Sequence, residues 1–436
     1  MDRNPHAPAR PLTLAVVGGG WAGLAAAVRG TQAGHAVTLF EMSAQLGGRA
    51  RAVAVDGLTL DNGQHILIGA YKRTLALMAL VGADIDDALD RRPLELRYPD
   101  GRGLKMPRGP AWLGFGLAVW RCRGWSMGDR WALLRTAAGW ALRGFSCDPR
   151  LTVNELCRGL PPAVRELLID PLCVAALNTP ASDASAAVLL RVLRDALFGG
   201  PGSSDLLLPR RSLDALLPQP AAHWLASAGT QVRSGHRVQA LAPAGGRWLV
   251  DGEAFDGVVL ACTATEAARL VMPHAADWAS EAQGLLYEPI VTVYLHGPGA
   301  RLPSPMMSLV ESPHAPAQFA FDHGALGGAV GVFAFVISGA RRWVDAGLDA
   351  AGAAVLRQAL ADFTPGTWPQ PPTVLRVLAE KRATFRCTPG LLRPAAMLAD
   401  GLAAAGDYIA GPYPATLEGA VRSGEAAARL LLSSAR

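Results

Sequence analysis

Apolar and polar positions at the start of the chain follow a strand, helix, strand order. An apolar run over residues 12–17 leads into a glycine-rich turn, GGGWAG at 18–23, and then into an Ala-rich stretch of helical spacing that ends near Gly34. A second apolar run over residues 35–40 ends at the acidic Glu41. This pattern predicts a βαβ unit in which a tight turn opens the helix.

Further along the chain the pattern divides into two kinds of segment. Residues 75–197 have mainly helical spacing, which Pro and Gly interrupt. A helix is expected near 343–363. Strand and helix signals like those of the first βαβ unit return at 223–259 and 402–431. Short apolar runs typical of an antiparallel sheet lie at 290–295, 307–310, 317–321 and 329–337.

The repeated strand and helix signals predict an α/β fold with one nucleotide-binding domain, to which three separate segments of the chain contribute. We expect this discontinuous, Rossmann-type domain at residues 10–75, 205–275 and 385–436. An inserted α+β substrate domain, with an antiparallel sheet and a helical part, is expected at 76–204 and 276–384.

The glycine-rich turn and Glu41 together predict a dinucleotide site. Gly18 permits the tight turn out of the strand, Gly20 lets the backbone approach a pyrophosphate, and Gly23 lets the helix lie close to the sheet. The first residues of that helix, Trp21 and Ala22, then face the phosphates. A carboxylate about 20 residues beyond the glycines accepts hydrogen bonds from ribose hydroxyls.

Composition narrows the class of protein. Half of the residues are hydrophobic, mean hydropathy is +0.21 and only 18% are charged. No apolar run approaches the roughly 20 residues of a membrane span, and residues 1–10 lack the apolar core of a secretion signal, so a cytoplasmic protein is expected. The net charge of +5 comes without a recognisable nucleic-acid module, so no nucleic-acid partner is predicted.

The cysteines predict neither a disulfide framework nor a metal site. They are scattered, without CxxC pairs and without histidines at metal spacing, and are therefore expected to be reduced thiols. The six are Cys122, Cys147, Cys157, Cys173, Cys262 and Cys387.

Further motifs make the chain resemble a known group of flavoenzymes. The clamp at 18–41, a second turn at 47–49 (GGR) and a late Gly406-Asp407 are similar to the FAD-dependent amine oxidase and phytoene desaturase superfamily. Within it, residues 61–65 (DNGQH) and 411–420 (GPYPATLEGA) resemble the squalene-associated desaturase branch, the hydroxysqualene dehydroxylases.

This resemblance implies a glutathione-reductase-like domain that holds FAD non-covalently. A covalent flavin link through Cys387 is not expected, because this cysteine lies outside the late turn. The cofactor residues expected from the clamp and the resemblance are Gly18, Gly20, Trp21, Ala22, Gly23, Glu41, Gly47, Gly48, Arg49, Gly63, Gln64, His65, Val238, Gly406, Asp407, Thr416, Leu417, Glu418 and Ala420.

Two residues are candidates for a part in the chemistry. His65 follows Gly63, where a ring system can lie on the backbone, so it is a candidate for contact with the flavin and for acid or base catalysis. The other reading is a structural histidine. Lys381 invites comparison with the active-site lysine of amine oxidases, whereas a strand residue paired with Glu380 is an equal alternative.

The substrate side is expected to meet a membrane surface. Five tryptophans and a cluster of arginines lie between residues 112 and 143, against a single acid, Asp129. Trp rings and Arg stems suit the headgroup boundary, so a helical part near 108–145 is predicted to touch the inner face of the cytoplasmic membrane. A helix with Trp in the core and Arg outside is the alternative.

For this family the implied reaction is the reduction of hydroxysqualene to squalene by FADH2, in squalene and hopanoid biosynthesis. No second glycine turn in a strand–helix context is present, so an external electron donor is expected as a partner beside the long-chain isoprenoid substrate. Carotenoid or polyprenoid desaturases and amine-oxidase-type flavoenzymes are the alternatives, and a non-catalytic prenyl-lipid-binding protein is a remote one.

Overall fold

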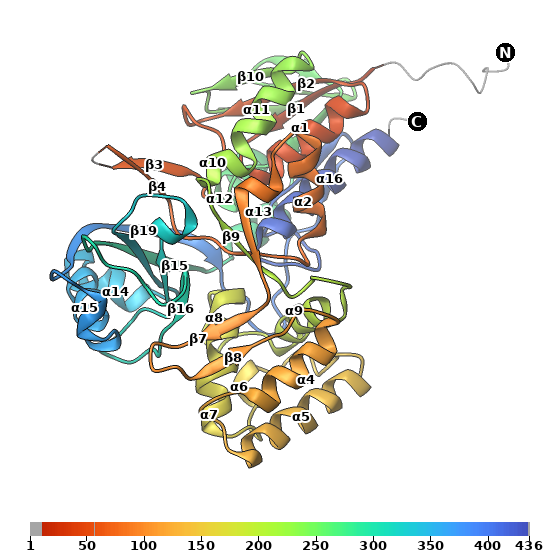
Figure 1. Ribbon diagram of the computed structural model, residues 1–436. Helices are drawn as coiled ribbons and strands as arrows, with labels where there is room; N and C mark the ends of the chain where they lie inside the picture. The colour runs from red at the N-terminus through yellow and green to blue at the C-terminus, as the bar shows by residue number, and fades with distance from the viewer. Residues whose placement is uncertain (1–10, 56, 435–436) are drawn as a thin grey trace.

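The computed structural model describes residues 11–55 and 57–434 (Figure 1). A six-stranded sheet has the order β10-β2-β1-β14-β21-β20 and is parallel except for the pair of β20 and β21. These strands come from all three segments that were assigned to the nucleotide domain. Their bounds are β1 (Thr13–Val17), β2 (Ala36–Glu41), β10 (Gln231–Ser234), β14 (Gly257–Leu260), β20 (Met397–Ala399) and β21 (Leu402–Ala404).

Helices with small or aliphatic buried faces cover one side of this sheet. The helices are α1 (Trp21–Gln32), α2 (Lys72–Leu80), α3 (Ile85–Ala88), α10 (Leu213–Leu216), α11 (Pro218–Ser227) and α16 (Leu417–Ser434). Helices α1 and α16 cross closely, since a Cβ on Gly424 would lie 2.0 Å from the carbonyl oxygen of Ala22. The expected domain boundary at 75/76 falls inside α2, which packs against α16.

A second sheet, antiparallel throughout, has the order β16-β17-β18-β15-β19. Its strands are β15 (Tyr287–His296), β16 (Met306–Ser308), β17 (Phe319–Asp322), β18 (Val332–Ile337) and β19 (Thr373–Phe385). The sequence pattern predicted all of them except β19. On β15, Val291, Val293 and Leu295 pack toward α15 (Leu348–Asp362), which follows α14 (Arg341–Ala346), so the alternate residues face the other way.

The remaining strands form small sheets around these two layers. They are β3 (Ala52–Val55) with β4 (Leu58–Asp61), β5 (Leu67–Ile68) and β6 (Leu89–Arg92) on either side of β9 (Leu206–Pro209), β7 (Glu95–Arg97) with β8 (Gly103–Lys105), and β11 (Leu241–Ala244), β12 (Arg247–Val250) and β13 (Glu253–Phe255). Strands β6, β7 and β8 lie in the region whose spacing predicted mainly helix.

The helical part lies at the end of the molecule farthest from the parallel sheet (Figure 1). It comprises α4 (Ala111–Arg121), α5 (Met127–Leu142), α6 (Val153–Leu156), α7 (Pro162–Val164), the π-helix η1 (Arg165–Ile169), α8 (Asp170–Leu177) and α9 (Ala186–Phe198). Helices α12 (Ala264–Val271) and α13 (Ala276–Gln283) and the 3₁₀ turns η2 (Gly324–Leu326) and η3 (Pro365–Thr367) complete the elements. In the described part of the chain, no helix is both long and apolar enough to cross a bilayer.

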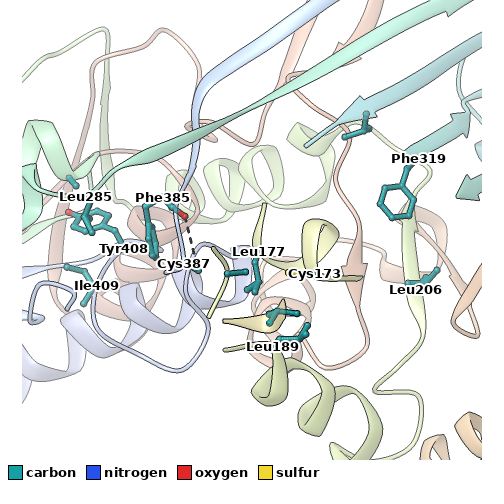
Figure 2. Close-up of a cluster of buried hydrophobic side chains, with 14 of the residues drawn as sticks. Cys173, Leu177, Leu189, Leu206, Leu285, Phe319, Phe385, Cys387, Tyr408 and Ile409 are labelled. Carbon is teal, nitrogen blue, oxygen red and sulfur yellow. Dashed lines mark hydrogen bonds between the residues drawn. The ribbon is translucent and has the colours of Figure 1, made fainter. Parts of the chain in front are cut away.

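One buried cluster joins the three parts. Figure 2 shows Leu177 and Leu189 of the helical part with Phe385 at the end of β19, and Tyr408 and Ile409 beyond the last strand of the parallel sheet. The six cysteines are free thiols, as predicted.

Asp61 fastens the parallel-sheet region to the antiparallel sheet. Its carboxylate Oδ1 accepts the Leu213 N–H (2.9 Å), and its backbone oxygen accepts the Tyr294 hydroxyl (2.8 Å). The residue is only 6% exposed. Burial raises the pKa of this carboxyl to about 7, although the Leu213 hydrogen bond opposes the rise.

We therefore expect Asp61→Asn to remove a pH-dependent loss of stability. The folded protein keeps the proton up to about pH 7, whereas the unfolded chain releases it near its ordinary pKa of about 4, so Asp61 lowers the free energy of unfolding as pH rises through this window. Urea unfolding between about pH 4 and 8 should show the variant gaining a few kcal/mol over wild type, with a plateau above pH 7.

The control is Asp277→Asn, at an exposed position on α13. Its unfolding curves should follow wild type at every pH. An Asp61→Asn curve that also runs parallel to wild type would contradict the assignment.

Candidate functional site

A cleft of about 690 Å³ opens where the carboxyl ends of β1, β2 and β14 face β15 and β19. Seventeen of the nineteen predicted cofactor residues line it. They are Gly18, Gly20, Trp21, Ala22, Glu41, Gly47, Gly48, Arg49, Gly63, Gln64, His65, Val238, Gly406, Asp407, Thr416, Leu417 and Ala420. The structure thus brings together motifs that lie about 400 positions apart in the sequence.

The two glycine turns lie against each other and form a cradle of bare backbone. Gly18, with φ +110°, makes the turn out of β1, and the Gly47 N–H donates to the Gly19 carbonyl oxygen at 2.8 Å. A Cβ on Gly48 would lie 3.1 Å from the Gly20 Cα, so a side chain there would fill the gap between the turns. This open backbone, next to the N-terminus of α1, fits a diphosphate.

Glu41 is held at the edge of this cradle. Its Oε2 accepts the Gly19 N–H and its Oε1 accepts the Ser43 N–H, both at 2.7 Å, and the residue is buried. A carboxylate has about four acceptor positions, so two remain for ribose hydroxyls.

Arg49 connects the cradle to the far end of the cleft. Its Nη2 donates to Asp407 Oδ1 at 2.6 Å, and its Nη1 donates to the carbonyl oxygen of Ala383 at 2.6 Å. Burial by itself lowers the pKa of Arg49, but the Asp407 carboxylate, together with Tyr287 and Glu380, more than offsets this, so the pKa is raised and the guanidinium stays charged.

Two predicted residues lie outside the cleft surface. Gly23 acts in packing, since a Cβ there would come within 1.8 Å of the Gly18 carbonyl oxygen. The fully buried Glu418 points toward α2, where its Oε2 accepts the Thr74 N–H (2.9 Å) and the Thr74 hydroxyl (2.8 Å). Its side chain therefore joins α16 to α2. Other residues at the start of α16, among them Leu417 and Ala420, face the cleft.

His65 sits on the cleft wall in a neutral form. Its Nδ1 lies 2.8 Å from the Gly63 carbonyl oxygen, which can only accept, so Nδ1 carries the proton and Nε2 is an acceptor. Burial lowers the pKa of His65; the Gly63 hydrogen bond opposes this and the charge of Arg49 adds to it. At neutral pH this ring accepts a proton more readily than it donates one.

Strand alternation places the Lys381 side chain outside the cleft, and no ion pair between Lys381 and Glu380 is found among the described residues. Leu378 and Glu380 on β19 line the cleft, whereas the Lys381 side chain is exposed. The Glu380 carboxylate accepts the Asn62 Nδ2–H at 3.3 Å. Lys381 is thus a strand residue on the outer face of the cleft wall.

Several cleft residues carry no motif signal in the sequence. They lie before Val238 and after β14, at the C-terminal end of α8, on β15 and β19, and directly after Asp407. These residues are His236, Arg237, Cys262, Thr263, Asn178, Ile290, Thr292, Leu378, Thr384 and Tyr408. Burial raises the pKa of Cys262 to about 12, so its thiol is protonated.

The fold and the cradle define a flavoenzyme, and sequence comparison agrees. The chain belongs to the family of flavin-containing amine oxidoreductases, whose sequence model matches residues 21–432. It is therefore a flavin-dependent oxidoreductase with an α/β cofactor-binding fold. The remote alternative of a non-catalytic prenyl-lipid-binding protein is not supported.

Within this family the chain is similar to proteins named hydroxysqualene dehydroxylase. The protein of Rhodopseudomonas palustris is 33% identical over 455 residues (97% of this chain, 99% of the relative), and that of Sinorhizobium fredii is 28% identical over 449 residues (97% and 99%). The solved structure of an oxidoreductase from Methanosarcina mazei shares the fold, with a TM-score of 0.73 at 16% identity (95% of this chain, 99% of that one).

Arg49→Gln should weaken flavin binding. The substitution leaves Asp407 and the Ala383 carbonyl without their charged donor, and the unpaired carboxylate then faces the cofactor. We expect at least a tenfold rise in the Kd for flavin, roughly the cost of one lost charge-assisted hydrogen bond, measured by flavin fluorescence on reconstitution.

Lys381→Gln is the matched control, because it removes a positive charge close to the cleft from a side chain that does not line it. Equal flavin affinity in both variants would contradict the role given to Arg49.

Proposed function

We propose that this protein reduces hydroxysqualene to squalene with FAD as a non-covalent cofactor, as a step of squalene and hopanoid biosynthesis. The observation that carries the proposal is the cleft, where a cradle for a dinucleotide adjoins an apolar wall. The two relatives named above support it, because their similarity runs over nearly the full length of both chains.

FAD would lie along the cleft from Glu41 to the start of α16. Glu41 would bind the adenosine ribose, the two glycine turns the diphosphate, and Arg49 with Asp407 the middle of the cofactor. The N-terminus of α16, at Thr416 and Leu417, would stabilise negative charge on the ring system.

The wall opposite the cradle is suited to a hydrocarbon chain. Val174 and Ala175 of α8, Ile290 of β15 and Leu378 of β19 line it. These side chains would align the isoprenoid and exclude water from the reacting carbon. The bound, reduced cofactor supplies a hydride.

The bond changes in the reduction of hydroxysqualene show that the reaction needs a proton and two electrons. The allylic C–O bond breaks, a C–H bond forms from the hydride, and the hydroxyl leaves with a proton as water. Two electrons per turnover then come from an external donor. His65 holds its proton at Nδ1 against Gly63 and presents Nε2 as an acceptor, which suits it to orient a water or hydroxyl group.

The reverse redox direction, as in carotenoid desaturases or amine oxidases, is the competing proposal. Anaerobic incubation of dithionite-reduced, FAD-loaded protein with hydroxysqualene should yield squalene, detected by mass spectrometry, with oxidation of the flavin in equal amount. Oxidised protein is the control and should give no squalene. Desaturation of a more saturated polyene by the oxidised protein, without squalene from the reduced one, would contradict the proposal.

We also propose that the enzyme works on the cytoplasmic face of the membrane, with α4 and α5 as the contact surface. Large apolar side chains on these two helices are 45–89% exposed: Trp112, Leu113, Leu117, Trp120, Met127, Trp131 and Leu142. The arginines among them are exposed at positions 121, 123, 135 and 143. Asp129 is already engaged as the capping partner of Ser126. This charge balance suits anionic headgroups.

Trp112→Ser combined with Trp131→Ser should release the protein from vesicles. Each ring is more than half exposed, so its loss leaves the fold intact and removes apolar area that would enter the headgroup region. Co-sedimentation should show strong binding of wild type to phosphatidylglycerol-containing vesicles, weaker binding to pure phosphatidylcholine, and at least tenfold weaker binding of the double variant.

Leu286→Ser is the control, since this equally exposed side chain lies elsewhere on the surface, outside α4 and α5. Its binding should match wild type. Unchanged binding of the double Trp variant would place the contact elsewhere.

A further inference from the structure

The cleft face of β15 carries one polar group whose role the cofactor site does not explain. Val291 and Val293 point into the core beneath α15, so Ile290 and Thr292 face the cleft. Thr292 is 1% exposed, and within the described residues its hydroxyl has no hydrogen-bond partner. A buried hydroxyl without a partner destabilises the folded protein, so its presence on this wall points to a ligand group that pairs with it.

The position of this hydroxyl places it at the end of the wall nearest His65. An atom built at the Cβ position of Gly63 would lie 3.9 Å from Thr292 Oγ1 and 4.0 Å from His65 Cε1. Both side chains therefore border the same open space above Gly63, which has φ +93°. Of its neighbours on this wall, Ile290 and the cross-strand Leu378 are aliphatic, and the next cleft-facing residue of β19, Glu380, already accepts a hydrogen bond from Asn62.

We propose that Thr292 is the residue that recognises the substrate hydroxyl, pairing with it above Gly63 while the hydrocarbon arms lie along Ile290 and Leu378. This inference rests on the proposed function and assigns the one polar feature of the substrate to one atom of the protein. Thr292 is a positioning residue here: it fixes which carbon of a long, nearly uniform chain stands in the reacting position.

The same hydrogen bond distinguishes the substrate from the product. Hydroxysqualene satisfies the Thr292 hydroxyl, whereas squalene fills the same space and leaves it unpaired in an apolar setting. A site built around a substrate hydroxyl rejects the analogue that lacks it. Loss of the hydroxyl in the reaction therefore weakens binding and favours product release.

Two other buried hydroxyls also lack partners among the described residues, Tyr408 and Ser308. Tyr408 follows Asp407 and lies at the cofactor end of the cleft, while Ser308 on β16 is absent from the cleft lining that the structure describes. Ser308 thus provides a matched control, a buried hydroxyl that does not meet the substrate.

The experiment compares the affinities of the FAD-loaded protein for squalene and hydroxysqualene at one fixed detergent concentration. Perturbation of flavin absorbance reports binding without turnover in the oxidised enzyme. Wild type should bind hydroxysqualene more tightly than squalene. Thr292→Val is a nearly isosteric change. In this variant the Kd for squalene divided by the Kd for hydroxysqualene should fall roughly tenfold. Thr292→Ser and Ser308→Ala should keep the wild-type ratio.

An unchanged ratio in Thr292→Val, with normal flavin content and thermal stability, would overturn the inference and leave the proposed function standing. If wild type binds neither compound, both are overturned. A drop in affinity for both compounds to the same extent would assign Thr292 to packing and would also overturn its role in recognition.

Discussion

The guanidinium of Arg49 joins the three parts of the chain that form the cleft. Arg49 donates to Asp407, near the end of the chain, and to the carbonyl oxygens of Arg382 and Ala383 on the antiparallel sheet. The glycine cradle, the last strand of the parallel sheet and the wall of the substrate region thus meet at one planar fork of donors. Arginine suits this position because its charge persists on burial and its donors diverge in a fixed geometry.

The motifs that the sequence revealed are those in which backbone geometry demands a residue type. Gly18, Gly47 and Gly48 adopt positive φ, and Glu41 follows a buried parallel strand, so each leaves a local signature. The βαβ unit, the discontinuous sheet and most of the antiparallel sheet were therefore predictable. The resemblance of these motifs to a flavoenzyme superfamily implied the flavin-dependent class, and the family comparison confirmed it.

Features that depend on distant packing were not predictable. Strand β19 mixes apolar and charged residues and has no fully buried residue before Phe385, so it lacks a clear apolar run. Strands β6 to β8 are three or four residues long, too short for a period to show. Glu418 lies in the same sequence motif as residues that line the cleft. Its side chain nevertheless points away from the cleft, because it accepts a hydrogen bond from Thr74 on another helix. Thr292 leaves no local pattern in the sequence. Its hydroxyl stands out only because none of the described residues around it in the folded protein offers a hydrogen-bond partner.

The order of strands in the parallel sheet also bears on how the protein is made. Thr13 on the first strand bonds Asp256, 243 positions later, and β21, which pairs with β14 on its other side, begins only at Leu402. During synthesis the first βαβ unit therefore waits with both edges of its sheet unpaired, since β2 pairs with β10 and β1 with β14, while the whole helical part emerges. Cofactor capture comes later still, after Asp407 and α16 leave the ribosome, so the flavin joins a chain whose substrate wall has already been synthesised.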